Sequence, residues 1–364
     1  MNRTDRPVVR MGSLGAALSF LLAACVPAAP PAPTAVTAPT APAPAREAPA
    51  AAAPQSKPAS KVALKSVFTS TSGTLAPITA TKEGGFFDEE GLDVSITRMQ
   101  AGAPAMAVLR SGEVPIALIG AQQIVEANLK GGDFVIIASF SEKLGQSIYV
   151  DKSIERPEQL KGKTLGVNNF GSIPHIAGKI GLEKLGLKDQ VTFVATGGPP
   201  ETMAALQAGA VQGVVISPPD SFRLRDLGYR EMIDISKIDA SSVNSAIITT
   251  RKWARENPDL VERYTRAMLK GTARMINDRE FGLKTMSQHS GMEDPRLLSE
   301  TLDYYREQFV RDGVPSMKAL QSNIDLAAEE IPEARNARPE QFVDLSFVEK
   351  IKASGLIEKL YGRS

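Results

Sequence analysis

The chain has 364 residues, of which 43% are hydrophobic, and its 42 lysines and arginines almost balance its 41 aspartates and glutamates. This length supports two domains, and the balanced charge excludes a general attraction to nucleic acid or to an anionic membrane surface. The single cysteine, Cys25, and only two histidines, His175 and His289, argue against an internal disulfide, a metal site and a cysteine nucleophile in the body of the chain. We therefore expect no cofactor and no metal ion.

The first 25 residues have the features of an export signal. Three arginines, at positions 3, 6 and 10, precede an uncharged stretch over 11–24 that is too short to span a bilayer. The stretch ends in "LAAC" at 22–25, which resembles the lipobox of bacterial lipoproteins. That resemblance implies that Cys25 is lipidated. The alternative is an ordinary signal peptide with an incidental cysteine.

Residues 26–60 consist almost entirely of alanine, proline, threonine and serine. Such a composition cannot bury a core, and the prolines favour an extended backbone. We interpret 26–60 as a disordered tether, long enough to hold a domain on the order of 100 Å from a membrane. The folded body is predicted to begin near Lys61.

The body opens with alternating strands and helices. Residues 62–68 and 92–96 alternate apolar and polar side chains, as strands with one covered face do, and 116–120 and 133–140 are typical of buried strands. Prolines at 77 and 104 mark the first turns of two intervening helices. A second series follows, with strands at 164–167, 191–196 and 213–217 and a helix that starts at the N-cap Ser172 and runs through Leu185.

One phrase occurs in both series. The segments 105–121 and 202–218 align without a gap, and both read as a helix, a glycine turn and a buried strand. We infer two similar α/β lobes with mostly parallel sheets flanked by helices; one larger sheet containing all the strands is the alternative. The matched positions are Met106/Met203, Ala107/Ala204, Leu109/Leu206, Gly112/Gly209, Val114/Val211 and Ile119/Ile216.

The last third of the chain has helical patterns only, beginning at Asn257 and Pro258. We expect this part to pack back on the first lobe. The predicted domains are a signal peptide at 1–25, the tether at 26–60, lobe 1 at 61–143 and 247–364, and lobe 2 at 144–246.

Four stretches together resemble a known family: residues 80–96, 160–172, 214–229 and 251–271 are similar to segments of the solute-binding proteins of ABC importers for sulfonates, taurine, nitrate and thiamine-pyrimidine precursors. The resemblance covers about residues 61–278. It departs from the family pattern at Pro115 and at Gln212, where an aspartate usually follows the glycine turn; both positions start strands, so we expect a small structural effect.

The resemblance implies a type II periplasmic-binding fold, in which two crossover strands join the lobes and a solute lies between them. It also implies an exported, lipid-anchored and monomeric protein that is not an enzyme and that works with an ABC permease and its ATPase subunits. Two alternatives stay open. One is a ligand-sensing partner of a membrane receptor; the other is an enzyme like the pyrimidine synthases of thiamine biosynthesis, which rely on a cysteine-rich motif that this body lacks.

In parallel α/β sheets, ligands bind beyond the carboxyl ends of the strands. The loops that leave such ends are rich in hydroxyls, glycines and amides, groups that suit a small polar or anionic solute, although the same residue types also serve as caps and turns. Phe170 and Phe222 are candidates for stacking on its organic part, Arg223 and His175 are possible cleft residues, and His289 is expected at the surface. The predicted ligand-binding residues are Ser70, Thr71, Ser72, Gly73, Gly120, Gln122, Lys143, Asn169, Phe170, Gly171, Ser172, Ser217, Pro218 and Asn244.

Overall fold

The structure is a computed structural model that describes residues 61–99 and 102–362. The predicted signal peptide, the lipidated Cys25 and the tether lie outside the described residues. Within 61–99 and 102–362, no helix combines the length and the apolar character needed to cross a bilayer. The same residues contain no group of three or more potential metal-ligating side chains.

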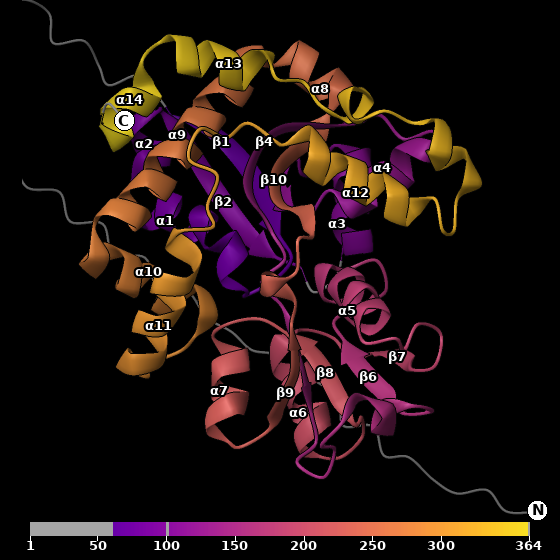
Figure 1. Cartoon of the computed structure of the whole chain (residues 1–364). Coiled ribbons are helices and arrows are strands. Elements are labelled where there is room, and N and C mark those ends of the chain that lie inside the picture. Colours follow the sequence, from indigo (N-terminus) through magenta and orange to yellow (C-terminus); the bar gives the residue numbers. More distant parts are fainter. Residues whose placement is uncertain (1–60, 100–101, 363–364) are drawn as a thin grey trace, which may run out of the picture. The chain divides into compact units, whose positions relative to one another are not determined.

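The strands form two separate five-stranded sheets, ordered β2-β1-β3-β10-β4 and β7-β6-β8-β5-β9 (Figure 1). One sheet containing all the strands is therefore ruled out. The strands are β1 (Val62–Phe68), β2 (Leu92–Arg98), β3 (Ile116–Ile119), β4 (Phe134–Lys143), β5 (Ser147–Val150), β6 (Thr164–Val167), β7 (Thr192–Ala195), β8 (Gly213–Ile216), β9 (Arg230–Asp234) and β10 (Ser241–Thr250).

Helices cover both sheets. They are α1 (Ala76–Glu83), α2 (Phe86–Glu89), α3 (Gly102–Ser111), α4 (Gln122–Leu129), α5 (Ile173–Lys184), α6 (Pro199–Gln207), α7 (Asp220–Asp226), α8 (Arg251–Glu256), α9 (Pro258–Asn277), α10 (Arg279–Ser290), α11 (Pro295–Arg306), α12 (Met317–Ala327), α13 (Ser346–Ala353) and α14 (Leu356–Tyr361).

Both sheets are mixed in the same way. In the first, β1 is parallel to β2 and β3, and β10 runs antiparallel between β3 and β4. In the second, β6 is parallel to β7 and β8, and β5 runs antiparallel between β8 and β9. Each sheet thus has a single strand opposed to the common direction, and the remaining strands agree with the predicted, mostly parallel arrangement.

The chain passes between the sheets twice. It leaves the first sheet at the end of β4 and enters the second at Ser147, and it returns by β10, which starts at Ser241. β10 begins before the predicted boundary at residue 247. The division into two domains stays a prediction; below, lobe 1 and lobe 2 denote the first and second sheet with their packed helices.

The repeated phrase forms equivalent elements. In lobe 1 it is α3 followed by β3, and in lobe 2 it is α6 followed by β8; both strands occupy the third place of their sheet. Gly112 and Gly209 sit just after the two helices with φ of 77° and 70°. Only glycine adopts this left-handed backbone at little cost, so it ends each helix and turns the chain into the strand.

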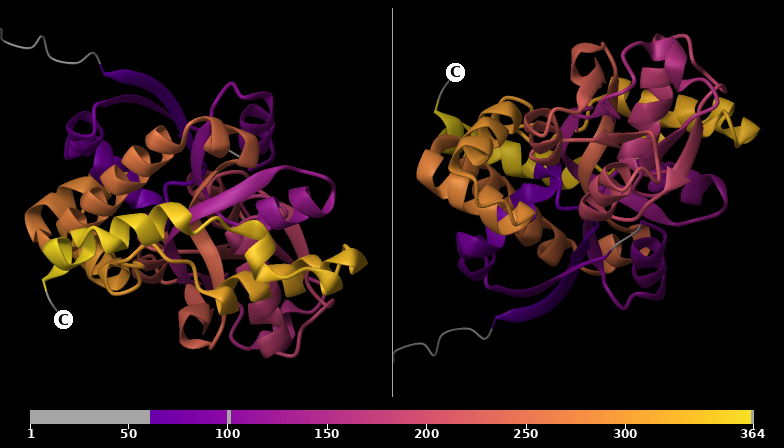
Figure 2. Two further views of the ribbon diagram at one scale, coloured as in Figure 1. Left: turned by 90° about the horizontal axis from the view of Figure 1, so that it is seen from above. Right: turned by 90° about the horizontal axis from the view of Figure 1, so that it is seen from below.

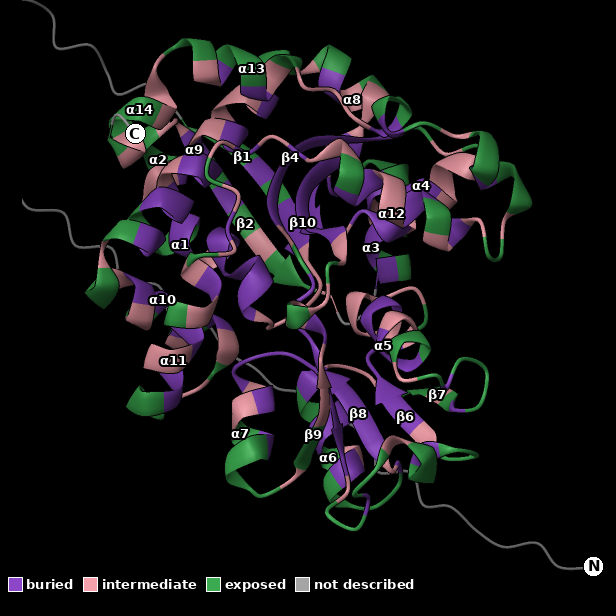
Figure 3. Ribbon diagram, viewed as in Figure 1, coloured by how far each residue is buried: buried purple, intermediate pink, exposed green. Residues whose placement is uncertain are grey.

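Alternate residues of the lobe 1 strands pack into two different cores. Ala117, Ile119 and Ile136 face the core under α3, α4 and α12. Leu118 and Ile137, on the other face, join a core that is covered by α1, α9 and α13. Figure 3 shows β4 and β10 mostly as buried and the outward faces of the helices as exposed or intermediate. A sheet covered on both faces explains why these strands read as nearly continuous apolar runs.

Lobe 2 repeats this arrangement on a smaller scale. Leu165, Val167 and Val215 pack with Leu182 of α5 on one face. Val214 and Ile216, which alternate with Val215 along β8, pack instead with α6 and α7. The period of two along a buried strand thus assigns its neighbouring residues to opposite cores.

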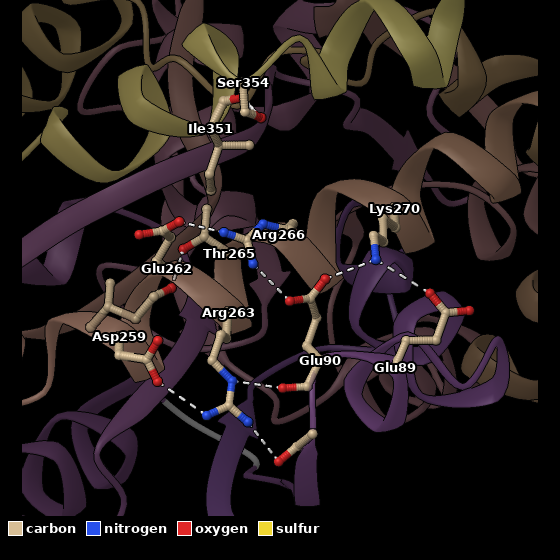
Figure 4. Close-up of polar contacts among 12 residues, drawn as sticks. Glu89, Glu90, Asp259, Glu262, Arg263, Thr265, Arg266, Lys270, Ile351 and Ser354 are labelled. Carbon is tan, nitrogen blue, oxygen red and sulfur yellow. Dashed lines mark hydrogen bonds and ion pairs between the residues drawn. The ribbon is translucent and has the colours of Figure 1, made fainter. Parts of the chain in front are cut away.

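The C-terminal helices pack on lobe 1, as expected (Figure 2). A polar network joins α9 to the turn after α2 (Figure 4). The nearly buried Glu90 carboxylate accepts hydrogen bonds from Arg266 and Lys270, both at 2.8 Å. Arg263 donates to the backbone carbonyls of Glu90 at 2.6 Å and Gly91 at 2.7 Å. This network fixes the start of β2 to α9, which follows the return strand β10 and α8 in the chain.

We predict that Glu90→Ala lowers the free energy of unfolding by about 2–3 kcal/mol. This is at or below the usual cost of removing one partner of a buried ion pair, because Arg266 and Lys270 keep some contact with water. Asp259→Ala is the matched control: Asp259 pairs with Arg263 on the same helix but is 77% exposed, so its loss should cost no more than ~0.5 kcal/mol. Equal effects in urea titrations of the two variants would contradict the assigned role of Glu90.

Candidate functional site

A small cavity of about 60 Å³ lies between the carboxyl ends of the strands of the two sheets. Both lobes line it, through the loops that follow β1, β3, β6 and β8 and through the crossover segments. The lining residues are Thr69, Ser70, Ser72, Thr74, Leu75, Gly102, Gly120, Gln122, Gln123, Gln146, Asn168, Asn169, Gly171, Ser172, Ile173, Pro174, Pro199, Val215, Ile216, Ser217 and Asn244.

The structure brings most of the predicted ligand-binding residues to this cavity. Ser70, Ser72, Gly120, Gln122, Asn169, Gly171, Ser172, Ser217 and Asn244 line it, whereas Thr71, Gly73, Lys143, Phe170 and Pro218 do not. Five further polar residues line the cavity without being among the predicted ligand-binding residues: Thr69, Thr74, Gln123, Gln146 and Asn168. Thr69, Thr74, Gln123 and Asn168 lie next to predicted residues in the chain or close to them, whereas Gln146 lies on a crossover connection, where nothing in the sequence indicated a cavity residue.

Three of the predicted residues outside the lining have other surroundings. Gly73 packs against Tyr305 so closely that a Cβ atom there would lie 2.3 Å from the ring; its glycine permits this approach. Phe170 is 62% exposed and forms a T-shaped contact with the His175 ring. Lys143 and Phe222 border a different hollow with Tyr304, so Phe222 does not face the cavity.

Ser72 is the best-anchored residue of the lining. Its hydroxyl lies 2.9 Å from the hydroxyl of Ser217 on the opposite lobe and 3.3 Å from the hydroxyl of Tyr305. Tyr305, fully buried in α11, also donates to the carbonyl oxygen of Pro218 at 3.1 Å. One tyrosine on the C-terminal helices therefore holds the cavity loops of both lobes in place.

His289 also anchors Ser72, and its expected surface position is wrong. It is 6% exposed in α10, with Nε2 3.1 Å from the Ser72 carbonyl oxygen and Nδ1 2.8 Å from the Thr79 hydroxyl. The contact with the carbonyl requires a proton on Nε2, so Nδ1 accepts from Thr79. Burial lowers the pKa of His289 to about 4, which keeps the ring neutral at physiological pH.

The loop of lobe 2 at the cavity is held by its own side chains. The Ser172 hydroxyl donates to the Asn169 carbonyl oxygen at 2.6 Å and makes no capping hydrogen bond to α5, although Ser172 does occupy the N-cap position. His175 Nδ1 accepts a hydrogen bond from the Gly171 N–H at 3.1 Å. Neither His175 nor Arg223 lines the cavity. His175 thus supports the loop from behind.

The cavity is polar but carries no fixed charge. Among the described residues that line it, none has an ionisable side chain; hydroxyls, amides and backbone groups supply its polarity. The nearby Asp220, at the start of α7, has a pKa raised to about 6 by burial, against the opposing effect of Arg223. Such a lining can bind a solute through hydrogen bonds, and it offers no acid–base pair or nucleophile with an activating base.

We predict that His289→Gln removes one component of the pH dependence of stability. The folded-state pKa of about 4 lies below the unfolded value near 6.5, so the neutral ring stabilises the fold above pH ~6.5, and this stabilisation, about 3 kcal/mol, is lost as the pH falls toward 4. The difference in unfolding free energy between wild type and variant should shrink over that range. A constant difference from pH 7 to pH 4 would show that His289 is not buried as a neutral ring.

Comparison with known proteins agrees with this architecture. The chain is 22% identical over 247 residues to a putative binding protein of Bacillus subtilis, covering 64% of this chain and 72% of the relative. It is 24% identical over 209 residues to the taurine-binding periplasmic protein of Escherichia coli, covering 56% of this chain and 64%, just under two thirds, of the relative. The alkanesulfonate-binding protein SsuA of Xanthomonas axonopodis, solved with MOPS, superposes with a TM-score of 0.65 at 18% identity over 79% of this chain and 99% of that one.

These similarities confirm the predicted periplasmic-binding fold. The family model described as NMT1/THI5 like matches residues 73–280, which is more than half of the chain and includes the repeated phrase and three of the four cavity loops in full. The chain therefore belongs to the NMT1/THI5-like family.

Proposed function

We propose that this protein is an extracytoplasmic, lipid-anchored solute-binding protein that captures a small polar or anionic organic solute and delivers it to an ABC importer. The observation that carries the proposal is the cavity itself, which both lobes line with hydroxyls, amides and glycines. A cavity formed between two lobes is suited to capture and release, because separating the lobes opens it to solvent.

The lining supports a solute with several hydrogen-bond acceptors. Hydroxyls of Ser70, Ser72 and Ser217 can donate, and the start of α5 presents free backbone N–H groups at the loop that contains Gly171. A sulfonyl or sulfonate group fits these donors, and two of the proteins compared above are named for taurine and alkanesulfonate. Nitrate, aromatic acids and pyrimidine-like solutes are the other members of the proposed range.

Contacts between the lobes support closure around a solute. Beside the Ser72–Ser217 contact, Arg225 of α7 donates to both carboxylate oxygens of Glu300 in α11, at 2.5 and 2.9 Å. On α5, Lys179 pairs with Glu329, which follows α12. Because these pairs are partly exposed, each contributes only ~0.2–1 kcal/mol. Such weak contacts leave the energy of closure to the solute, which is what a binding protein requires.

There are two alternatives to delivery to an importer. In one, a membrane receptor recognises the closed, solute-bound protein; in the other, the protein is an enzyme. A sensing partner of a membrane receptor would use the same cavity and the same closure, and a permease and ATPase encoded beside the gene would favour transport. An enzyme like the thiamine-pyrimidine synthases would need a reactive group at the cavity. The described lining supplies no cysteine and no histidine, and we therefore propose binding without chemistry.

Direct titration tests this function. We expect taurine, ethanesulfonate, nitrate, an aromatic acid or an aminopyrimidine to bind the purified protein, and the bound solute at one hundred times its Kd to raise the unfolding free energy by about 2.7 kcal/mol. If no compound of these classes changes the melting temperature or gives heat in calorimetry, the proposed solute range is wrong.

We predict that Gly120→Val weakens solute binding at least about tenfold, equivalent to 1.4 kcal/mol. A Cβ atom at Gly120, in lobe 1, would lie 3.0 Å from Cδ1 of Ile173 in lobe 2, so the larger valine side chain should hold the lobes apart. The backbone at Gly120 is not left-handed, and the fold should survive. Ala204→Val, at an exposed position of α6, is the control. Wild-type affinity in the Gly120 variant would place the solute elsewhere.

We predict that Cys25→Ser abolishes lipidation and leaves the precursor unprocessed by the lipoprotein signal peptidase. The reason is that the lipobox cysteine is both the acylated residue and the first residue of the mature lipoprotein. Metabolic labelling with a fatty acid and gel mobility of wild type and variant provide the measurement. A wild-type protein that is found without acyl chains would contradict the proposed anchor.

A further inference from the structure

Two amide side chains of the cavity have acceptor oxygens that meet no donor. Gln146 and Asn244 line the cavity and are each 2% exposed. Gln146 Oε1 and Asn244 Oδ1 are both buried without a hydrogen-bond partner among the residues that the structure describes. An unsatisfied buried carbonyl oxygen costs roughly 1–3 kcal/mol, so both positions favour a molecule that brings hydrogen-bond donors into the cavity.

The orientation of the Asn244 amide is fixed. Its Nδ2 donates to the backbone carbonyl oxygen of Lys143 at 2.8 Å. Turning the amide by half a rotation would place two carbonyl oxygens against each other, so Oδ1 must be the free atom. Asn244 lies in β10 and Gln146 in the connection from β4 to β5. Both acceptors therefore lie on the two segments that join the lobes.

These oxygens differ from the hydroxyls of the lining, and also from the amide oxygens of Gln122 and Asn168, which already accept from Asn323 and Thr202. Serine and threonine hydroxyls both donate and accept, so they adapt to almost any polar solute, whereas an amide oxygen only accepts. A sulfonate, nitrate or sulfone group offers no hydrogen to it. An amino group carries two hydrogens, as many as the described lining has buried, unpartnered amide oxygens, whereas a hydroxyl carries only one. The pair of acceptors thus discriminates among solutes that the hydroxyls would all accommodate.

We propose that Gln146 and Asn244 select a solute that carries an uncharged N–H₂ group, such as an amide, a carbamoyl, a sulfonamide or a ring amino group. The group is uncharged because no carboxylate is present in the described lining, and a buried ammonium without a counter-charge is strongly disfavoured. This inference rests on the proposed solute-binding function and narrows its solute class from polar or anionic to N–H-bearing.

Three probes of nearly equal size test it: methanesulfonamide, dimethyl sulfone and methanesulfonate, which differ only in an NH₂, a CH₃ or an O⁻ on the same sulfonyl group. Calorimetric or NMR titration of the wild-type protein should give a Kd for methanesulfonamide at least about tenfold below that for either other probe. Tenfold corresponds to 1.4 kcal/mol, the scale of one satisfied buried hydrogen bond.

Gln146→Leu is the decisive variant, because its side-chain oxygen has no partner to lose. It should keep or raise the unfolding free energy while reducing the preference for methanesulfonamide over dimethyl sulfone to about threefold or less. Asn244→Leu should reduce the preference in the same way, with some loss of stability from the unpaired Lys143 carbonyl. Gln207→Leu, on an exposed position of α6, should change neither quantity.

The outcomes separate the two proposals. Equal wild-type affinity for the three probes, or an unchanged preference in both cavity variants, overturns the selection of an N–H₂ group while leaving solute binding intact. If neither these probes nor taurine, ethanesulfonate, nitrate, an aromatic acid or an aminopyrimidine binds at all, the proposed solute-binding function is overturned, and this inference falls with it.

Discussion

The hydrogen bond between the hydroxyls of Ser72 and Ser217 joins the two lobes, and the arrangement of the cavity loops depends on it. It is the place where the carboxyl end of a lobe 1 strand meets that of a lobe 2 strand, and it borders the cavity. Tyr305 fixes it through the Ser72 hydroxyl and the Pro218 carbonyl, and His289 fixes the Ser72 carbonyl. α10 and α11, although far from the cavity loops in sequence, thus position the residues that face a solute.

The neutral lining gives the site its chemical character. Charged side chains near the cavity pair with one another outside it, as Arg225 does with Glu300 and Lys179 with Glu329. The pairs bridge the lobes at the periphery, while hydrogen bonds of uncharged groups operate inside. An interior without fixed charge recognises a solute by the direction and number of its donors and acceptors, and this is the type of recognition in which two unpartnered amide oxygens have the largest effect.

Much of the fold could be predicted from the sequence, because local patterns of apolar residues and glycines determine the strands and turns. Alternation and glycine turns located the strands, and the repeated phrase marked equivalent elements of two lobes, since Gly112 and Gly209 adopt the same backbone conformation. The rule that ligands lie beyond strand ends led to loops that line the cavity. The sequence did not show which individual residues face the cavity, because helices far away in the chain determine this. Gly73 packs against the Tyr305 ring of α11 and does not line the cavity. His289 is buried where α10 packs on Thr79 of α1. Gln146 was missed because it lies on a crossover connection, where no local pattern marks a side chain that faces the cavity.

The proposed function requires that the two lobes close around a solute at this cavity. The distance between two spin labels on opposite lobes measures this closure. The labels are placed at Ala103 of α3 and Glu201 of α6, which are both exposed. Cys25, the only native cysteine, is replaced by serine so that only these two positions are labelled. Double electron–electron resonance without and with a solute that binds in titration gives the two distributions. We expect the solute to shorten and narrow the distribution of distances. An unchanged distribution at saturating solute would contradict closure around the solute.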